Sequence, residues 1–271
     1  MDSCCKPSPN PDSRPFPPPI DCLMFDLDDT LYSTGSGIAD SLRKNIEDFL
    51  VERCGIAAEK ASALRAELFK TYGSSLVGLR ALGYDVDADD YHSIVHGRLP
   101  YHLIKPDPQL RKLLRHISQR KIIFTNSDRI HATRVLKRLG MEDCFDQVVC
   151  FETMNPNLSN RSSLDVSPVI LKPSPEAIRI AIRETHVDPH RTLFLDDNVR
   201  NVASGKAAGL RTVLVGKTGK TKEADYSLEA MINLPRVVPE IWANSTDREG
   251  RVRSEETQMD TIPTAATLVG A

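Results

Sequence analysis

The chain has 271 residues, of which 35 are basic, 37 are acidic and 40% are hydrophobic. This composition is typical of a globular protein and excludes collagen-like, fibrous and membrane-channel classes. The formal net charge of -2 provides no global positive field, so we expect neither a nucleic-acid partner nor attachment to an anionic membrane.

The two ends of the chain differ in composition from its middle. Seven of the 18 prolines lie in residues 1–19, which predicts an extended, disordered arm, either solvated or docked on an aromatic groove. Residues 244–271 have no aromatic side chain and no helical periodicity, which predicts a disordered tail. No secretory signal or apolar run of about 18 residues is present, so we expect a cytoplasmic protein. The six cysteines form no CxxC pair and predict neither a disulfide framework nor a zinc site.

Short apolar runs alternate with amphipathic segments through the folded part of the chain. The runs predict strands at Cys22–Phe25, Lys121–Phe124, Val148–Phe151, Thr192–Leu195 and Thr212–Val215. Helical periodicity predicts helices at Pro108–Ser118, Ile130–Leu139, Pro175–Glu184 and Val199–Ala208. Strands that are apolar throughout imply burial on both faces. The sequence therefore predicts an α/β fold with a doubly wound, mostly parallel sheet.

One segment interrupts the alternation. From Ile38 to about His96 the apolar residues recur at helical spacing with no strand between them. We interpret this segment as a helical insertion after the first strand. Because parallel sheets bind ligands at the carboxyl ends of their strands, the insertion either covers such a site or serves only to stabilise the fold.

Two carboxylates, Asp26 and Asp28, directly follow the first predicted strand in the segment DLDDTLY. A calcium loop would need Gly at its sixth position and a carboxylate at its twelfth, but Leu31 and Gly37 stand there. The pair alone is compatible with either an active site or an ordinary acidic turn.

Polar groups of complementary types follow other strands. Thr125 and Asn126 come after the second strand, where a helix start favours an anion. Lys172 precedes a later helix, and the pair Asp196 and Asp197 ends the fourth strand. Parallel strands bring such positions to one edge of the sheet, so we expect these groups to form one site.

The charges of this predicted site imply a cation. Two carboxylates about 4 Å apart repel by about 4 kcal/mol at an effective dielectric near 20. Magnesium prefers oxygen ligands, keeps several waters and bridges to phosphate. We therefore expect Mg²⁺ at the carboxylates, with Lys172 and Thr125 holding a phosphate opposite it.

The order of these motifs resembles the haloacid dehalogenase superfamily of phosphatases over about residues 20–242. The segments MFDLDDTLY, HGRLPY, TNSD, CFETMNP and TLFLDDN resemble its pyrimidine 5′-nucleotidase-like branch, especially plant members. The resemblance implies a Rossmann-like core at residues 20–34 and 105–243 and a C1-type helical cap at 35–104. It also implies hydrolysis of a nucleoside 5′-monophosphate, with xanthosine monophosphate favoured. Ser33 and Thr34 stand where the resemblance leads us to expect a proline after Tyr32. The resemblance therefore does not define the geometry of the cap hinge.

The resemblance also assigns residue roles. Asp26 would be the nucleophile and Asp28 the general acid and base, with Thr125 and Lys172 completing the catalytic set. The implied Mg²⁺ ligands are the Asp26 carboxylate, the Asp28 main-chain oxygen, Asp196, and Asp197 directly or through water. The oligomeric state is left open.

Other activities share parts of this pattern. A dehalogenase of the same fold would attack carbon through Asp26. The resemblance implies that such members need neither a metal nor a second aspartate, although this chain has the carboxylates for both. A phosphomutase shares all four motifs and would need a sugar bisphosphate activator. A pyrimidine nucleotidase, another small phosphomonoester phosphatase and a non-enzymatic regulatory protein on the same fold also remain, although the last would normally have lost Asp26 or Asp28, which are both present.

Discrimination between substrates is expected from the cap and from the start of the helix after the second strand. A planar, oxygen-rich base suits a guanidinium or an aromatic ring, which favours Arg80 and Arg98 as substrate-binding residues. The alternative is that both arginines are solvated. Asn126, Asp128 and Arg129 are further expected contacts with the substrate.

Overall fold

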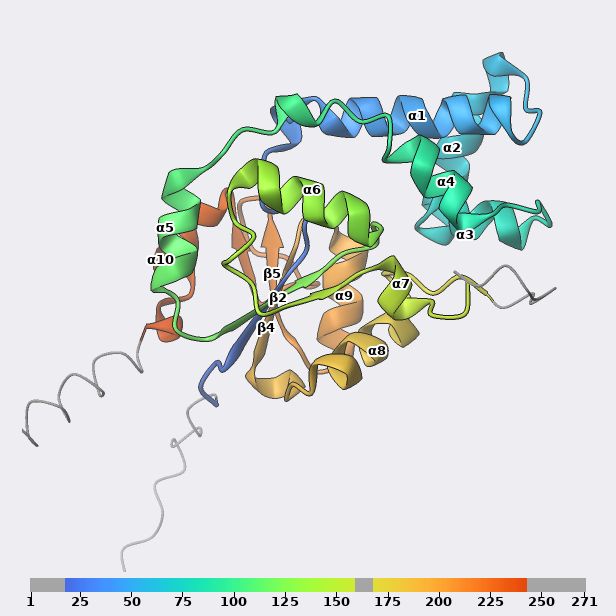
Figure 1. Ribbon diagram of the computed structural model, residues 1–271. Helices are drawn as coiled ribbons and strands as arrows, with labels where there is room; N and C mark the ends of the chain where they lie inside the picture. The colour runs from blue at the N-terminus through green and yellow to red at the C-terminus, as the bar shows by residue number, and fades with distance from the viewer. Residues whose placement is uncertain (1–17, 159–167, 243–271) are drawn as a thin grey trace, which may run out of the picture.

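A computed structural model describes residues 18–158 and 168–242. Within these residues the core is a six-stranded parallel sheet in the order β3-β2-β1-β4-β5-β6 (Figure 1). The strands are β1 (Cys22–Phe25), β2 (Arg120–Phe124), β3 (Gln147–Val149), β4 (Thr192–Asp196), β5 (Arg211–Val215) and β6 (Tyr226–Leu228). The predicted doubly wound α/β fold is confirmed.

Helices cover both faces of the sheet, as the uniformly apolar strands predict. They are α5 (Pro108–His116), α6 (Arg129–Leu139), α7 (Phe151–Met154), α8 (Pro175–Thr185), α9 (Val199–Ala207) and α10 (Leu234–Val237). Alternate residues of β1 enter two different cores: Phe25 joins the cluster with α5, α6 and α10, whereas Met24 joins the cluster with α8. The sheet is therefore buried on both sides, and its free surface for a site is the edge where the strands end.

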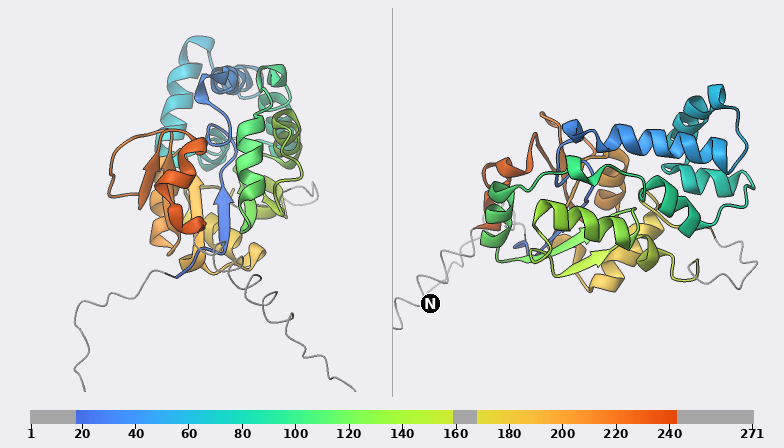
Figure 2. Two further views of the ribbon diagram at one scale, coloured as in Figure 1. Left: turned by 90° about the vertical axis from the view of Figure 1, so that its left-hand side faces the viewer. Right: turned by 45° about the horizontal axis from the view of Figure 1, so that its top comes forward.

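Four helices lie between β1 and α5 in the chain. They are α1 (Ile38–Glu52), α2 (Ala58–Tyr72), α3 (Ser75–Ala81) and α4 (Ala88–Val95). We call them the cap helices. Both Figure 1 and Figure 2 show them beyond the carboxyl ends of the strands and extending to one side of the sheet.

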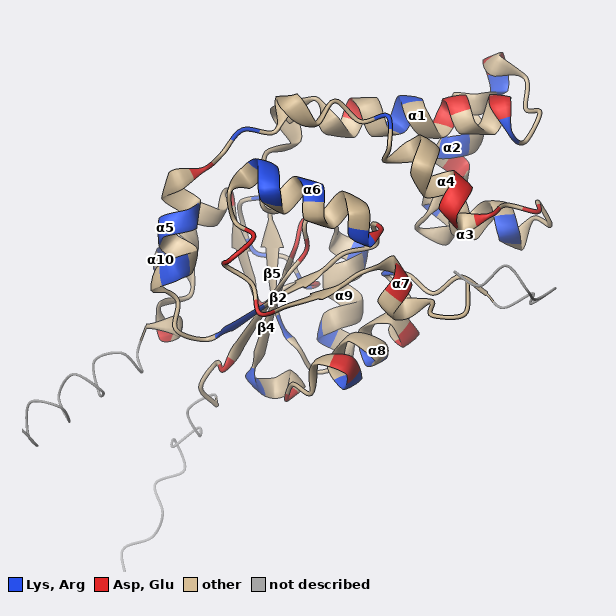
Figure 3. Ribbon diagram, viewed as in Figure 1, with Lys and Arg blue, Asp and Glu red and all other residues tan. Residues whose placement is uncertain are grey.

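The cap helices pack on one another through close and specific contacts. The Asn45 side chain donates to the main-chain oxygen of Val95 over 2.9 Å, which joins α1 to α4. A Cβ at Gly78 would stand 2.6 Å from Cδ2 of Leu68, so glycine allows α3 to approach α2 this closely. Their charged residues face outward, and Figure 3 shows both signs interspersed along α1.

Two local predictions were wrong. The strand expected at Val148–Phe151 ends at Val149, because Cys150 caps the short helix α7 and its main-chain N–H donates to the Thr153 hydroxyl. The edge strand β6 was not predicted, since its three residues form no apolar run. The predicted arms lie outside the described residues, apart from residues 18 and 19 of the first arm. Residue 243, the predicted end of the core, also lies outside them. No helix among the described residues combines the length and the apolarity that crossing a membrane requires.

Candidate active site

The carboxyl ends of the central strands bring the predicted charged residues together. Asp26 follows β1, which lies between β2 and β4 in the sheet, and Asp196 ends β4. The ammonium of Lys172 lies between them, 2.7 Å from Asp26 Oδ1 and 2.8 Å from Asp196 Oδ2. Because β1 is the strand at which the chain changes direction through the sheet, this position is the usual ligand site of such folds.

Lys172 is completely enclosed, with 1% of its surface exposed. Its third hydrogen-bond acceptor is the main-chain oxygen of Phe124, at 2.6 Å. Burial alone would lower the pKa of Lys172, but the charges of Asp196 and Asp26 outweigh it and the pKa is raised. Lys172 is therefore a permanent cation whose three N–H groups are already engaged by the protein.

This arrangement changes the charge argument made from the sequence. That argument placed Mg²⁺ at the carboxylates and Lys172 opposite it, whereas the structure places the Lys172 ammonium between Asp26 and Asp196. Asp26, Asp196 and Asp197 each offer an oxygen, and these oxygens lie within 4.8 Å of one another. Three carboxylates against one ammonium leave an excess of negative charge when all are ionised, which a divalent cation would neutralise.

The pKa values of the cluster reflect this crowding. Burial raises the pKa of Asp26 well above its ordinary value; Lys172 opposes the rise, and the Asp196 and Asp197 charges add to it. Burial and the neighbouring Asp196 raise the pKa of Asp197 to about 7. Carboxyl groups that bind protons this readily are expected where a cation belongs, because a bound ion takes the place of the proton.

Asp196 is fixed by the start of α9. Its Oδ1 accepts from the main-chain N–H of Asn198 at 2.8 Å, and both of its oxygens accept from the Asn201 side chain at 3.0 and 3.1 Å. Asp196 is fully buried, whereas Asp197 lines a cavity. The two aspartates are thus positioned differently: one anchors the cluster and the other faces the space above it.

Asp28 belongs to a separate hydrogen-bond network. It accepts from the Tyr32 hydroxyl at 2.7 Å and from the Ser127 hydroxyl at 2.8 Å, and its Oδ1 lies 2.8 Å from His131 Nε2. The other ring nitrogen of His131 lies 2.8 Å from the Tyr101 hydroxyl. This network connects Asp28 to α6 through His131 and, through Tyr101, to the segment that returns from the cap.

The network sets the protonation of Asp28. Burial raises its pKa, but the charge of His131 and the hydrogen bonds from His131, Tyr32 and Ser127 more than offset that effect, so the pKa is lowered. Burial lowers the pKa of His131, but Asp28 outweighs it and the net change is upward. The pair therefore favours a carboxylate beside an imidazolium, in contrast to Asp26.

A cavity of about 240 Å³ lies above both aspartates. Its floor includes Asp26, Asp28, Thr125 and Lys172 from the core. Its opposite wall comes from the cap helices and is largely apolar, formed by Leu42, Ile46, Phe69, Leu76 and Val95. The cavity thus joins a charged core surface to an apolar cap surface.

The residues expected to recognise the substrate lie in different places. Asn126 lines the cavity, but its side chain holds the main chain of Lys172 through two hydrogen bonds of 2.8 and 2.9 Å. Arg98 forms a two-pronged ion pair with Glu52, at 2.9 Å for each contact, on the exposed surface. Neither Arg98 nor Arg80 is among the described residues that line the cavity.

The start of α6 is also occupied by structural contacts. Asp128 accepts from the main-chain N–H of His131 at 2.8 Å and so caps the helix, and it also contacts His96. Arg129 is exposed, and its main-chain N–H donates to the Glu152 carboxylate at 3.0 Å. Sequence reasoning missed the His131 contact with Asp28, and it missed His92 and His96 in the cavity wall. The spacing of His92 and His96, one helical turn apart, was the available signal.

The comparisons with known proteins agree with this architecture. A family model described as a haloacid dehalogenase-like hydrolase matches residues 20–209. Phosphate metabolism protein 8 of Saccharomyces cerevisiae is 26% identical over 84% of this chain and 76% of its own length. Phosphoglycolate phosphatase of Rhodospirillum rubrum is 30% identical over 77% of this chain and 84% of its own.

A solved structure has a similar fold. The HAD phosphatase from Thermococcus onnurineus superimposes with a TM-score of 0.54 at 20% identity, over 80% of this chain and 97% of that one.

Proposed function

Because the chain belongs to the haloacid dehalogenase-like hydrolase family, we propose that it is a Mg²⁺-dependent phosphatase of small phosphomonoesters. The observation that carries the proposal is the division of labour between two aspartates at the floor of one cavity. Asp26 lies in a cluster of carboxylates around Lys172, whereas Asp28 lies in a hydrogen-bond network with His131. These are the surroundings that a nucleophile and a proton-transfer group require.

Asp26 is the proposed nucleophile. Lys172 holds Oδ1 and the Thr30 hydroxyl holds Oδ2 at 3.0 Å, so the carboxylate has a fixed orientation. An Asp26 oxygen forms a bond to phosphorus while the bond from phosphorus to the substrate's ester oxygen breaks. Water then attacks the aspartyl phosphate, which releases inorganic phosphate and regenerates the Asp26 carboxylate.

Asp28 is the proposed general acid and base. It supplies the proton that the departing ester oxygen needs and later accepts one from the attacking water. Because the pair favours a carboxylate beside an imidazolium, His131 would hold that proton before the first step and receive one through Asp28 after the second. The Tyr32 and Ser127 hydroxyls keep its side chain aimed from the floor of the cavity.

The carboxylate cluster fits a hard divalent cation. Asp26, Asp196 and Asp197 would hold Mg²⁺, because their carboxylate oxygens lie within 4.8 Å of one another. The main-chain oxygen of Asp28 is a further proposed ligand. When bound, the ion would neutralise phosphate oxygens that face the nucleophile. Thr125 is buried at the cavity floor, where its hydroxyl is a proposed phosphate contact. Lys172, whose N–H groups are held by Asp26, Phe124 and Asp196, would act on the phosphate through its positive charge.

The proposed substrate is a nucleoside 5′-monophosphate, with xanthosine monophosphate favoured, as in the plant xanthosine monophosphate phosphatases that the motifs resemble. The apolar cap wall, with Phe69 half exposed, supports a planar leaving group. The cavity of about 240 Å³ is smaller than the roughly 300–1,000 Å³ of common ligand pockets. A whole nucleotide would therefore extend its base toward the opening. Pyrimidine nucleotides and other small phosphomonoesters are the alternative substrates, and a cytoplasmic location belongs to the same proposal.

A substrate panel tests the proposal. We would measure phosphate release with Mg²⁺ from purine and pyrimidine nucleoside monophosphates, small sugar phosphates and an aryl phosphate. The proposal predicts turnover without a sugar bisphosphate activator and the highest kcat/KM for a nucleotide, with xanthosine monophosphate foremost. Turnover confined to sugar phosphates would remove the nucleotide assignment, and no phosphate release from any ester would remove the phosphatase assignment.

A further inference from the structure

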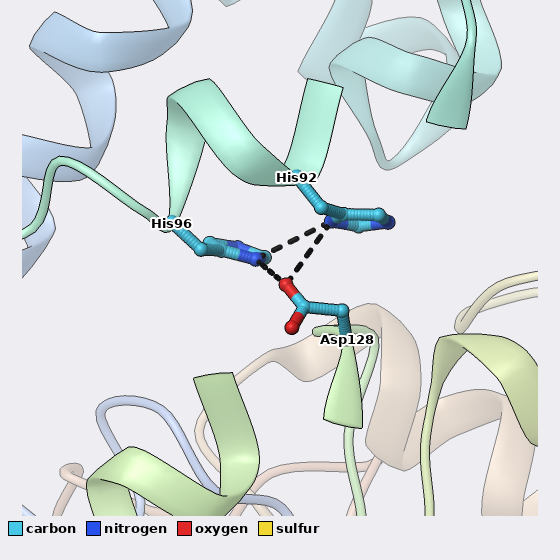
Figure 4. Close-up of side chains that lie close together, drawn as sticks. All are labelled: His92, His96 and Asp128. Atoms are coloured by element: carbon cyan, nitrogen blue, oxygen red, sulfur yellow. Dashed lines mark hydrogen bonds and ion pairs between the residues drawn. The ribbon is translucent and has the colours of Figure 1, made fainter. Parts of the chain in front are cut away.

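We propose that His92, His96 and Asp128 form a second metal site, for a divalent transition metal such as Zn²⁺, that joins the cap to the core. Each of the three residues offers one ligand atom, and these atoms lie within 4.8 Å of one another. His92 lies in α4, His96 ends that helix one turn later, and Asp128 precedes α6 in the core. Figure 4 shows the two rings and the carboxylate directed toward one point.

The separations between the ligand atoms approach those of a tetrahedral site. The two Nδ1 atoms are 3.3 Å apart, and Asp128 Oδ2 lies 3.6 Å from His92 Nδ1 and 2.6 Å from His96 Nδ1. Metal bonds of about 2.0–2.1 Å in a tetrahedron place neighbouring ligand atoms about 3.3–3.4 Å apart. Two of the three separations therefore suit a bound ion already. The third needs the carboxylate and the His96 ring to separate by about 0.7 Å, a side-chain adjustment.

The hydrogen bonds within the cluster leave part of it unsatisfied. One proton on His96 Nδ1 accounts for the short contact with Asp128. His92 Nδ1 then has only that same His96 proton as a possible donor within the cluster, over 3.3 Å, and His92 Nε2 is a buried atom without a hydrogen-bond partner among the described residues. All three residues are buried, with at most 8% of their surfaces exposed. Two imidazoles and a carboxylate that share a single proton are incompletely paired, and a metal ion would use both Nδ1 lone pairs at once, with the His92 proton on Nε2.

The surroundings also favour neutral imidazoles, the form that binds metals. His92 packs against the Phe151 ring, with 4.5 Å between ring centroids, and the two histidine rings are stacked. Burial and the neighbouring His96 lower the pKa of His92 to about 3, although Asp128 opposes them. At neutral pH His92 is therefore a free base.

The donor set distinguishes this cluster from the carboxylates around Lys172. Two imidazoles and one carboxylate suit Zn²⁺ and related transition metals, whereas Mg²⁺ prefers oxygen ligands alone. Three protein ligands leave a fourth position for water or a substrate atom. His92 and His96 also line the cavity above Asp26 and Asp28. An ion here would hold α4 against the core at the edge of that cavity. The cysteine pattern predicted no zinc site, and no cysteine takes part in this one.

The test measures metal binding by the full chain without relying on turnover. Protein stripped with EDTA is titrated with Zn²⁺ by calorimetry and with Co²⁺ by visible absorption, because a tetrahedral Co²⁺ site absorbs strongly. The titrations use the Asp26→Asn background, which weakens the carboxylate site. His92→Asn and His96→Asn remove one imidazole each, and an asparagine amide at position 96 can still donate to Asp128. His102→Asn, at an exposed histidine outside the cavity, is the matched control, and circular dichroism verifies that each variant is folded.

The proposal predicts that one equivalent of metal binds and that Co²⁺ gives an intense spectrum. The His92 and His96 variants should bind the metal at least about tenfold more weakly, or by about 1.4 kcal/mol, whereas the His102 variant should bind it unchanged. Equal binding by all variants would show that surface histidines hold the ion. Binding lost only when Asp197→Asn is added would assign the ion to the carboxylates. No binding at all would leave a hydrogen-bonded contact between cap and core. Each of these three results overturns the proposal, and none of them bears on phosphate release with Mg²⁺.

Discussion

The two walls of the cavity are built in different ways. On the core wall, Lys172 contacts both Asp26 and Asp196, and Asn126 holds the Lys172 main chain, so each charged group is fixed by another. The cap wall consists mainly of apolar side chains from helices, among them Leu42, with only a few polar groups. The difference suggests that the core wall determines the chemistry, whereas the cap wall determines which leaving group fits.

Replacing the proposed nucleophile should have the largest effect. Asp26→Asn keeps the volume of the side chain but removes its nucleophilic oxygen, and we expect phosphate release to fall by more than about a thousandfold. The measurement is steady-state release of phosphate from the best substrate of the panel. Asp40→Asn, at an exposed aspartate on α1 paired with Arg43, is the matched control. Activity within about tenfold of wild type in a folded Asp26→Asn variant would contradict the covalent mechanism.

Removal of the metal from the core wall should also abolish activity. We expect EDTA to abolish phosphate release and added Mg²⁺ to restore it, because three carboxylates crowd around one ammonium. Ca²⁺ should support little turnover, since its larger and looser coordination shell misplaces the nucleophile. Full activity in EDTA would favour the metal-independent dehalogenase type of chemistry over the one proposed.

Asp28→Asn separates proton transfer from binding. General acid and base catalysis contributes about a hundredfold or more, so we expect kcat to fall by that factor while KM changes little. For an ester whose leaving group needs no proton, such as a nitrophenolate, the rate of the first step should fall less. Unchanged steady-state rates on alkyl esters would show that Asp28 serves only the hydrogen bonds to Tyr32 and His131.

Substitutions in the cap should change selectivity more than chemistry. Phe69 lines the cavity with half of its surface exposed. We expect Phe69→Ala to raise KM for the preferred nucleotide about tenfold, or about 1.4 kcal/mol, and to leave a small sugar phosphate nearly unchanged. Arg80→Ala and Arg98→Ala test the sequence-based assignment in the same assay. A larger effect from either arginine than from Phe69 would mean that the base reaches beyond the cavity.

The smallest effect concerns stability below neutral pH. His92 has an ordinary pKa of 6.5 when unfolded and about 3 when folded, because burial and His96 disfavour its charged form while Asp128 opposes them. Between these values the unfolded chain binds the extra proton, so this contribution to stability decreases as pH falls. His92→Asn should weaken that dependence in metal-free buffer, by at most about 2 kcal/mol between pH 6.5 and pH 5. Urea unfolding at the two pH values measures it, and parallel curves for both proteins would contradict it.

The sequence predicted the core wall well because its signals are local. Short apolar runs such as Cys22–Phe25 and Thr192–Leu195 identify a buried parallel sheet, and such a sheet brings the residues after its strands to one edge. Asp26 and Asp196 could therefore be grouped from their positions alone, whereas the strand end expected at Lys172 is a loop before α8, from which its side chain reaches both aspartates. The short strand β6 and the helix α7 were missed because three or four residues carry too little pattern.

Contacts that depend on helix orientation, within the core and between cap and core, were harder to predict. His131 meets Asp28 across 103 positions of sequence, and His96 meets Asp128 across 32. Periodicity identifies the buried face of a helix but not the residue opposite it. Arg98 illustrates the limit, because its charge suggested a substrate contact whereas in the structure it pairs with Glu52 at the surface.

The central claim is that Asp26 becomes phosphorylated during turnover. Rapid acid quenching of the enzyme mixed with Mg²⁺ and its best substrate, followed by peptide mass spectrometry, tests this claim directly. The account predicts a mass increase of one phosphoryl group on the Asp26 side chain, absent from Asp26→Asn and from samples without Mg²⁺. Complete turnover with the phosphoryl group on another residue, or on none at any quench time, would contradict it.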